Sequence, residues 1–424
     1  MRGRALLCPL LFLLTGPRAF AQQIQVGVLG LFHPREITLS PAGREAIVVA
    51  TDDQVFVLEP GTRAAIARIE MSVTDLLFQL DGRLVRTAEI RATGRNQQSA
   101  AFLLGIPGKI SRQYQGTLDV RTMSAEIVPI VTMDLETAVA SVVAAELTKD
   151  TPLETLKAQA IVTRSYFVAG KGRHHDFGFC DTTHCQFLRE PPPADSLARV
   201  ATLATRGLVL TYEGKPFAAM FTRSCGGHTR TPAEVGVSSV SYPYYSVLCD
   251  ACYSSPARWT RRISEQYLRR LIGKGEAGRL AVNRTLGWNT VLSNSFAVRR
   301  ENGEVVLEGT GEGHGIGLCQ RGARAMAEVG ANFREIISHY FPNTSLISLD
   351  TSTGYPLHNS SVGGPELPTD ERRARAVRRN KRSRTLDEGA SSPRPQDSQQ
   401  RRDQNDKCES NVSIRTSSLP RLAL

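Results

Sequence analysis

The chain is organised around residues 134–186, which predict two helices followed directly by a cluster of cysteine and histidine. In the first helix, Leu135, Val139 and Val142 recur at helical spacing, and the next position on that face is Glu146. A carboxylate at the end of an apolar face is costly unless it is paired or kept partly protonated. Such a group is suited to act as a general acid near neutral pH. The alternative is that Glu146 lies at the edge of the face and reaches water.

A second helix is predicted directly after the first. Residues 151–154 read as a capping box with Pro at the first helical position, and Gly170 ends the segment. The apolar face of this helix includes Arg164, which there requires a carboxylate or an anionic ligand. Arg164 is therefore a candidate substrate contact. The alternative is a buried ion pair between Arg164 and Glu146.

The segment after the second helix is rich in metal ligands. His174, Cys180, His184 and Cys185 predict a closed tetrahedral zinc site of structural role, with His175 as the rival of His174. A disulfide between Cys180 and Cys185 is the alternative, but it leaves the clustered histidines unexplained.

A second group of cysteines follows a predicted hairpin, whose strands 207–212 and 217–222 flank a turn at 213–216. Cys225 and His228 could form another zinc site with Cys249 and Cys252. A disulfide from Cys225 to Cys249 or Cys252 is the favoured alternative, and it is natural in an oxidising compartment.

A second hairpin is predicted to turn at Asn302 and Gly303, and its outgoing strand 305–307 leads into a glycine-rich segment. That segment, residues 309–317, precedes a helix predicted to begin near Leu318. Such a turn lets a ligand approach the backbone closely. A phosphate-binding loop is excluded, because the Lys-Ser/Thr pair of that motif is absent.

Four separated motifs resemble those of the stage II sporulation protein D family, the SpoIID/LytB domain, and occur in the family's order. They are VVAAEL with LKAQAIVTRSYF, then CDTTHCQ, then SCGGHT at 224–229, and GEGHGIGLCQRGARAMA at 311–327. The resemblance covers roughly residues 114–344. Two positions depart from the family's pattern: Glu312 stands where Trp is frequent, and Cys319 where Ser is usual.

The resemblance implies a lytic transglycosylase that cuts peptidoglycan glycan strands stripped of their stem peptides. Glu146 would be the single general acid and base, since no second carboxylate is well placed near it for a two-carboxylate mechanism. Arg164, Ser224, His314 and Gln320 would be substrate contacts. The alternative is a non-catalytic wall-binding protein that stimulates a cell-wall amidase. A zinc hydrolase is disfavoured because four protein ligands leave no open metal position.

The expected fold is α+β, with a mixed sheet and with helices that carry the acid. Residues 1–21 predict an export signal, 22–113 a β-rich region, 114–350 the catalytic domain and 351–424 a basic disordered tail. The first strand of the β-rich region is predicted from Ile24, Val26 and Val28, which alternate with Gln25 and Gly27. The formal net charge is +11, but export to the periplasm or cell wall argues against nucleic acid as a partner. No transmembrane segment is expected in the mature chain.

Overall fold

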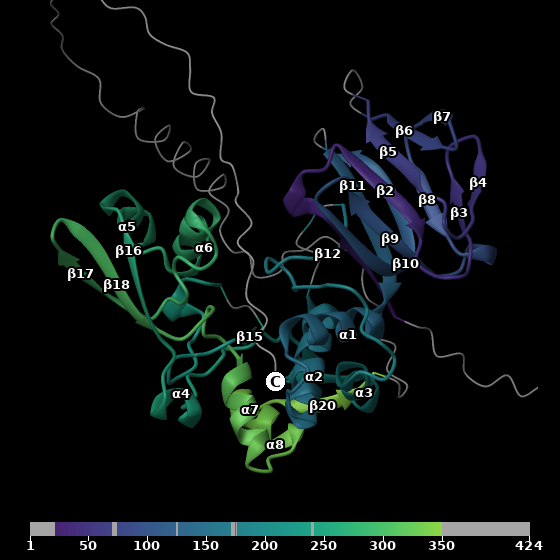
Figure 1. The fold of residues 1–424 in the computed structure, drawn as a ribbon. Coiled ribbons are helices and arrows are strands. Elements are labelled where there is room, and N and C mark those ends of the chain that lie inside the picture. The colour runs from purple at the N-terminus through teal and green to yellow at the C-terminus, as the bar shows by residue number, and fades with distance from the viewer. Residues whose placement is uncertain are drawn as a thin grey trace, which may run out of the picture. The chain divides into compact units, whose positions relative to one another are not determined.

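The strands of the N-terminal part form one large sheet, as their alternating pattern predicts (Figure 1). The structure is a computed structural model that describes residues 22–69, 74–123, 126–170, 174, 176–238 and 241–349. The predicted signal and tail lie outside these residues. The strands in this part are β1 (Gln23–Gly27), β2 (Glu36–Pro41), β3 (Ile47–Ala50), β4 (Val55–Leu58), β5 (Ala64–Arg68), β6 (Leu76–Leu80), β7 (Arg83–Thr87), β8 (Ile90–Thr93), β9 (Ala100–Ile106), β10 (Ile110–Met123) and β11 (Glu126–Asp134).

This sheet is mixed, as predicted, because one strand from much later in the chain joins its edge. The order is β12-β1-β11-β10-β9-β2-β5-β6-β7, with β8, β3 and β4 branching from β10. Strand β12 (Phe179–Cys180) pairs in parallel with β1, and the other pairings are antiparallel. In β1, Ile24 and Val26 are buried while Gln23 and Gln25 are exposed, which is the alternation expected of a strand with one face on the core.

Strand β10 is long enough to hold two parts of the sheet together. Its first half pairs with β9 and its second half with β11 and β8. The change occurs at Gly116, where a Cβ atom would lie 2.3 Å from the carbonyl oxygen of Thr132. Glycine is therefore required for the two strands to approach. The predicted domain boundary at 113/114 falls inside β10, and the division into domains stays a prediction.

Helices α1 (Leu135–Glu146), α2 (Leu153–Ala169) and α3 (Leu197–Ala204) follow the sheet. The chain turns from β11 into α1 at Asp134, whose carboxylate accepts hydrogen bonds from the N–H groups of Glu136 and Thr137, an N-cap arrangement. The capping box predicted at 151–154 is wrong. No side chain caps α2, and the carboxylate of Glu154 accepts bonds from Lys157 and from the N–H of Phe333 instead.

The remaining elements form smaller sheets and helices. Strand β13 (Leu208–Tyr212) pairs with β14 (Lys215–Pro216) and β20 (Ser345–Ser348), and β15 (Phe221–Thr222) pairs in parallel with β19 (Leu318–Cys319). The predicted return strand 217–222 is therefore only partly correct, because its last two residues pair with β19. Helices α4 (Asp250–Ser254), α7 (Gln320–Glu328) and α8 (Phe333–Tyr340) complete this part.

One further layer has a hydrophobic core of its own, centred on Trp259 and Leu307. Strands β16 (Arg258–Ile263), β17 (Phe296–Glu301) and β18 (Glu304–Thr310) form its sheet, with the predicted turn at Asn302 and Gly303 between the last two. Helices α5 (Glu265–Leu271) and α6 (Gly275–Leu286) were not predicted. In the described part of the chain, no helix is both long and apolar enough to cross a membrane.

Candidate functional site

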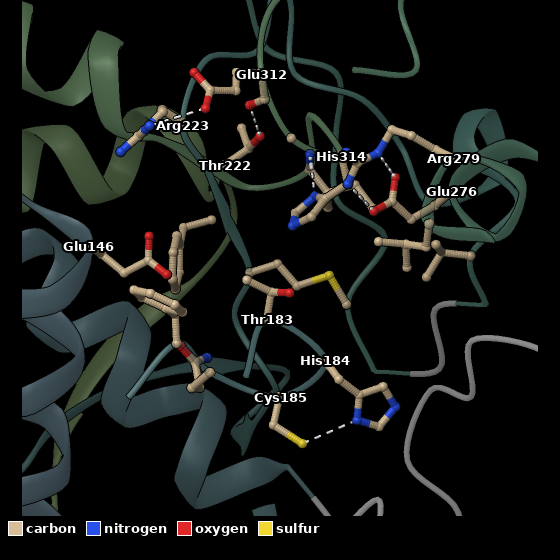
Figure 2. Close-up of a pocket in the computed structure, with 18 of the residues that line it drawn as sticks. Glu146, Thr183, His184, Cys185, Thr222, Arg223, Glu276, Arg279, Glu312 and His314 are labelled. Carbon is tan, nitrogen blue, oxygen red and sulfur yellow. Dashed lines mark hydrogen bonds and ion pairs between the residues drawn. The ribbon is translucent and has the colours of Figure 1, made fainter. Parts of the chain in front are cut away.

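Glu146 is the last residue of α1 and lines a pocket of about 310 Å³ (Figure 2). Burial raises the pKa of this carboxyl to about 7, although a hydrogen bond with Gln320 and the charges of Arg223 and Arg189 favour the ionised form. The end of a helix acts in the same direction as burial, because its carbonyl groups carry partial negative charge. Near neutral pH, Glu146 is thus divided between a form that donates a proton and one that accepts it.

Gln320 connects the carboxyl group to the helix behind it. It is the first residue of α7, it is buried, and its Nε2 donates to Oε1 of Gln159 in α2 at 3.3 Å. The amide nitrogen carries two hydrogens, so it can serve Gln159 and Glu146 together. Gln320 therefore contacts the carboxyl group of Glu146 from behind, and it is not among the residues that line the pocket.

The glycine-rich segment forms another wall of the pocket. Gly313 and Gly317 have φ values of 101° and 73°. A Cβ at Gly313 would lie 2.4 Å from Oγ1 of Thr222, and one at Gly317 would lie 2.1 Å from the carbonyl oxygen of Met220. Thr222 also accepts a hydrogen bond from the N–H of Gly315 at 3.1 Å. Glycine is required here so that the segment can lie against β15.

His314 projects from this segment and lines the pocket (Figure 2). Its Nδ1 accepts a hydrogen bond from the N–H of Ile316 at 3.0 Å. In the neutral ring this bond places the proton on Nε2, which makes that nitrogen a donor.

Two more carboxylates line the pocket, and both pair with arginine. Glu276 is buried and holds Arg279 through two contacts of 2.6 and 2.8 Å. Burial alone would raise the pKa of Glu276, but the Arg279 guanidinium holds it below its ordinary value. Glu312 makes a more exposed pair with Arg223 at 3.1 Å. Figure 2 shows both pairs in the pocket wall.

The structure does not bring Arg164 to the pocket, and its prediction as a substrate contact is corrected. Its side chain is fully buried, and Nε and Nη2 bind the two carboxylate oxygens of Glu136 at 2.8 and 2.6 Å. The carbonyl oxygens of Leu208 and Thr202 accept its other hydrogens. The alternative of an ion pair was therefore right in kind, but the partner is Glu136 rather than Glu146.

Ser224 is also placed away from the pocket lining. It is buried, its backbone forms a two-way bridge with Glu312, and its hydroxyl lies 3.4 Å from Sγ of Cys252. Its geometry is that of a residue that positions the glycine-rich segment.

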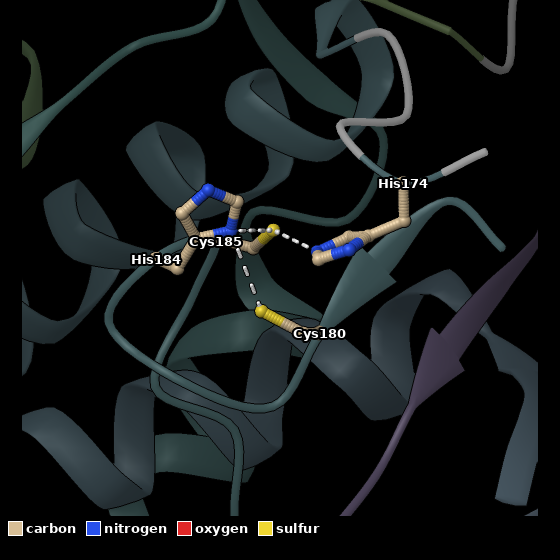
Figure 3. A group of neighbouring side chains, drawn as sticks. All are labelled: His174, Cys180, His184 and Cys185. Carbon is tan, nitrogen blue, oxygen red and sulfur yellow. Dashed lines mark hydrogen bonds between the residues drawn. The ribbon is translucent and has the colours of Figure 1, made fainter. Parts of the chain in front are cut away.

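The four residues predicted as metal ligands lie together (Figure 3). Sγ of Cys185 lies 3.5 Å from Nε2 of His174 and 3.6 Å from Nδ1 of His184, and Sγ of Cys180 lies 3.7 Å from the same Nδ1. The rival ligand His175 lies outside the described residues.

The donor set fits a tetrahedral ion. With metal–sulfur and metal–nitrogen bonds of about 2.3 and 2.1 Å, a tetrahedral zinc separates nitrogen from sulfur by about 3.6 Å. The three separations bracket this value. His184 and Cys185 also line the pocket, so the cluster supports one of its walls.

Several residues of the site were missed by sequence reasoning. Gln159 lies in the LKAQAIVTRSYF motif. Most residues of α2 are buried, so no periodic pattern distinguishes Gln159 from its neighbours. Glu276 and Arg279 lie on α6, which was not predicted. Their i, i+3 spacing is the local signal that could have indicated an ion pair. The favoured disulfide of Cys225 is not found, because the cysteines among the described residues are free thiols.

Comparison with known proteins agrees with the resemblance seen in the motifs. Residues 124–212 match the model of a family described as SpoIID, Stage II sporulation protein. An uncharacterised protein of Brachyspira hyodysenteriae is 25% identical over 268 residues, which are 55% of this chain and 72% of that protein. The Stage II sporulation protein D of Bacillus amyloliquefaciens is 27% identical over 51% of this chain and 75% of its own length. A Bacillus subtilis protein named Amidase enhancer is 24% identical, over 46% of this chain and 38% of its own length.

Proposed function

The chain carries a domain of the SpoIID/LytB family, and on this premise we propose that it is an exported lytic transglycosylase acting on the glycan strands of peptidoglycan. The observation that carries the proposal is the pKa of about 7 that burial gives to Glu146 at the wall of a pocket. An acid with a pKa near the working pH can give a proton and take one back within a single reaction.

In the proposed reaction, Glu146 donates its proton to the glycosidic oxygen as the bond from that oxygen to the muramyl anomeric carbon breaks. The 6-hydroxyl of the same muramyl residue then attacks the anomeric carbon and gives its proton to Glu146. The product ends in 1,6-anhydromuramic acid, no water is consumed, and the acid returns to its starting state. One carboxyl group is therefore sufficient.

The state of the other pocket carboxylates supports this assignment. Glu276 is held ionised by Arg279, so it has no proton to donate at neutral pH. Glu312 is committed to Arg223 at the more exposed side of the pocket. A second carboxylate for a hydrolytic mechanism would have to leave an arginine before it could act.

Two of the predicted contact residues keep a role in the proposal. His314 lines the pocket and offers Nε2–H as a donor to a sugar hydroxyl or acetamido oxygen, and Gln320 orients the acid through its hydrogen bond to Glu146. Both act by positioning, which can supply a large part of a rate enhancement. Arg164 and Ser224 have no part in substrate binding in this scheme.

We place zinc at the cluster of His174, Cys180, His184 and Cys185, in a structural role. A bound zinc ion would there cross-link the loop that carries His184 and Cys185 to strand β12. Four protein ligands complete a tetrahedral shell, so the chemistry of the reaction stays with Glu146.

The name of the Bacillus subtilis relative motivates a second candidate function, in which the chain binds wall glycan and stimulates an amidase without cutting. This alternative keeps the pocket but does not depend on the proton of Glu146.

The test compares the full chain with Glu146→Gln on glycan strands freed of stem peptides, with products analysed by mass spectrometry. We expect anhydromuramyl ends from the unchanged protein and a loss of about 10²–10⁴-fold or more in Glu146→Gln. Glu312→Gln is the matched control, since it removes a pocket carboxylate without removing the acid, and it should retain most of the activity.

Reducing ends in place of anhydro ends would overturn the transglycosylase and indicate a hydrolase. Glycan binding without cleavage by either protein, together with equal stimulation of an amidase, would establish the second candidate instead.

A further inference from the structure

Four cysteines from three separate segments meet at a second place in the fold. Cys225 follows β15, Cys249 is the N-cap of α4, Cys252 lies in its first turn, and Cys319 ends β19. Their side chains are 0–4% exposed, and the four Sγ atoms all lie within 4.8 Å of one another. Cys319, at a position where the family usually has Ser, thus completes a group of four.

The spacing of the sulfur atoms distinguishes a metal site from disulfides. A disulfide holds two sulfurs about 2.0 Å apart, whereas Cys252 and Cys319 are 3.6 Å apart. A tetrahedral ion with four metal–sulfur bonds of about 2.3 Å separates its sulfurs by about 3.8 Å. In iron–sulfur clusters the cysteines bind different iron atoms, which spreads their sulfurs over a larger volume. The group therefore fits a single ion.

Polar hydrogens are directed at the sulfur atoms, as expected around thiolates rather than around thiols used as apolar filling. The hydroxyl of Tyr340 donates to Sγ of Cys249 at 3.3 Å, and the N–H of Cys225 donates to Sγ of Cys319 at 3.4 Å. The Ser224 hydroxyl lies 3.4 Å from Sγ of Cys252. Such outer contacts hold metal ligands in orientation and balance their charge.

We propose that Cys225, Cys249, Cys252 and Cys319 form a second, structural zinc site with four thiolate ligands. Soft thiolates in a tetrahedral arrangement select zinc, and four of them leave no position for water. His228, the ligand considered from the sequence, is not a member of the group; its ring packs on Tyr253. The proposal is independent of the catalytic role of Glu146.

A zinc ion at this site would hold together segments of the chain that border the pocket. Cys319 follows the glycine-rich segment that carries His314, and Cys225 follows Arg223 by two residues, so one ion would join two segments with pocket residues to α4. Helix α7 lies close over the group, since a Cβ at Gly322 would be 2.4 Å from Sγ of Cys249. Loss of the ion should loosen the glycine-rich segment more than the large sheet.

The test counts metal in the purified full chain by inductively coupled plasma mass spectrometry. We expect two zinc ions per chain, one in Cys319→Ser and one in Cys185→Ser. His228→Ala is the matched control and should keep two. Cys319→Ser should also lower the melting temperature.

If Cys319→Ser does not fold, zinc X-ray absorption on Cys185→Ser addresses the same site with its ligands intact. It should report four sulfur neighbours and no nitrogen around the remaining ion. The unchanged protein should give the average of the two sites, three sulfurs and one nitrogen.

One zinc ion per unchanged chain that is kept in Cys319→Ser and lost in Cys185→Ser would overturn the proposal. So would a gain of mass on reduction that maps to these four cysteines, which would reveal disulfides. Iron in place of zinc, seen by metal analysis and visible absorption, would overturn the choice of ion, and loss of an ion in His228→Ala would overturn the ligand set.

Discussion

At the scale of single residues, the main feature is a carboxyl group whose environment opposes its charge. Glu146 is partly buried, stands at the C-terminal end of a helix, and receives its hydrogen bond from a neutral amide. Burial and the helix end both disfavour a carboxylate, and the hydrogen bond from Gln320 offsets only part of that cost. The cost is tolerated because α1 is anchored by buried residues such as Val139 and Val142.

This environment makes stability depend on pH in a defined direction. The folded pKa of Glu146 is raised from 4.5 to about 7, so its contribution to stability is complete below pH 4.5 and is lost as the pH rises through 7. One pKa unit corresponds to about 1.4 kcal/mol, which sets an upper limit on the order of 3 kcal/mol, and residual solvation makes it smaller. Glu146→Gln should therefore be more stable than the unchanged protein at pH 8, and nearly equal to it at pH 4.5.

Urea unfolding at both pH values measures this difference. Glu328→Gln, which alters an exposed pair with Arg324, is the control and should show little change at either pH. A Glu146→Gln protein that is less stable at pH 8 would mean that the carboxylate is stabilised in the fold.

At the scale of elements, one buried ion pair joins the first three helices. Arg164 of α2 binds Glu136 at the start of α1 and also the carbonyl of Thr202 in α3. Glu136 further accepts the N–H of Gly207, just before β13. Four elements are thus held by one guanidinium and one carboxylate.

Removing one partner should cost more than removing the pair. Arg164→Met leaves the carboxylate of Glu136 without its cation in a buried site, and we expect a loss of about 3–5 kcal/mol in the free energy of unfolding. The double variant with Glu136→Gln should recover part of that loss. Arg223→Met removes an arginine from an exposed pair and should cost less than about 1 kcal/mol. Denaturant unfolding checks all three, and equal losses for the two single arginine variants would contradict the structural role of Arg164.

Sequence periodicity could predict the position of Glu146 but not the partner of Arg164. Glu136 and Glu146 both lie on α1, and ten residues place them about 80° apart around its axis. Which of the two meets Arg164 depends on how α1 and α2 cross, and that is set by packing rather than by local pattern. The grouping of the cysteines and histidines at 174–185 could be predicted because they are close in sequence. The proximity of Cys319 to Cys252 could not be predicted, because 67 residues separate them in the sequence.

Local composition explains what was missed elsewhere. Helix α6 contains Gly275, Gly278 and three polar residues on its buried side, Glu276, Arg279 and Asn283. Glycine weakens helical preference, and buried polar residues hide the apolar period. The pocket wall that carries Glu276 was therefore not visible in the sequence. By contrast, the alternation in β1 and the turn at residues 302–303 are local signals, and both predictions are confirmed.

At the scale of the whole molecule, the pairing of the last described strand indicates how far the C-terminus can be shortened while the fold is kept. Strand β20 pairs with β13, and the N–H of Leu349 donates to the carbonyl of Gly207. A chain ending at Asp350 keeps these bonds, so we expect an unchanged melting temperature and, under the proposed function, unchanged cleavage of glycan.

A chain ending at Thr344 is the matched control for this truncation. It removes β20 and uncovers Val209 and Leu210, which are fully buried in the intact fold. Its melting temperature should fall by several degrees, since about 2–4 °C corresponds to each kcal/mol in a chain of this size. Differential scanning calorimetry compares the two truncations, and an equal fall in both would show that residues after 350 belong to the fold.

The parallel pairing of β1 with β12 has a consequence for how fast the chain can fold. Val26 pairs with Phe179, about 150 residues further along, and contacts between such distant residues slow folding because a long loop must close first. Strand β1, which is synthesised early, is thus among the last strands to complete its pairings. Until β12 arrives, one edge of β1 is open to strands of other chains. The interval between synthesis and the closing of this edge is when the protein is most exposed to aggregation.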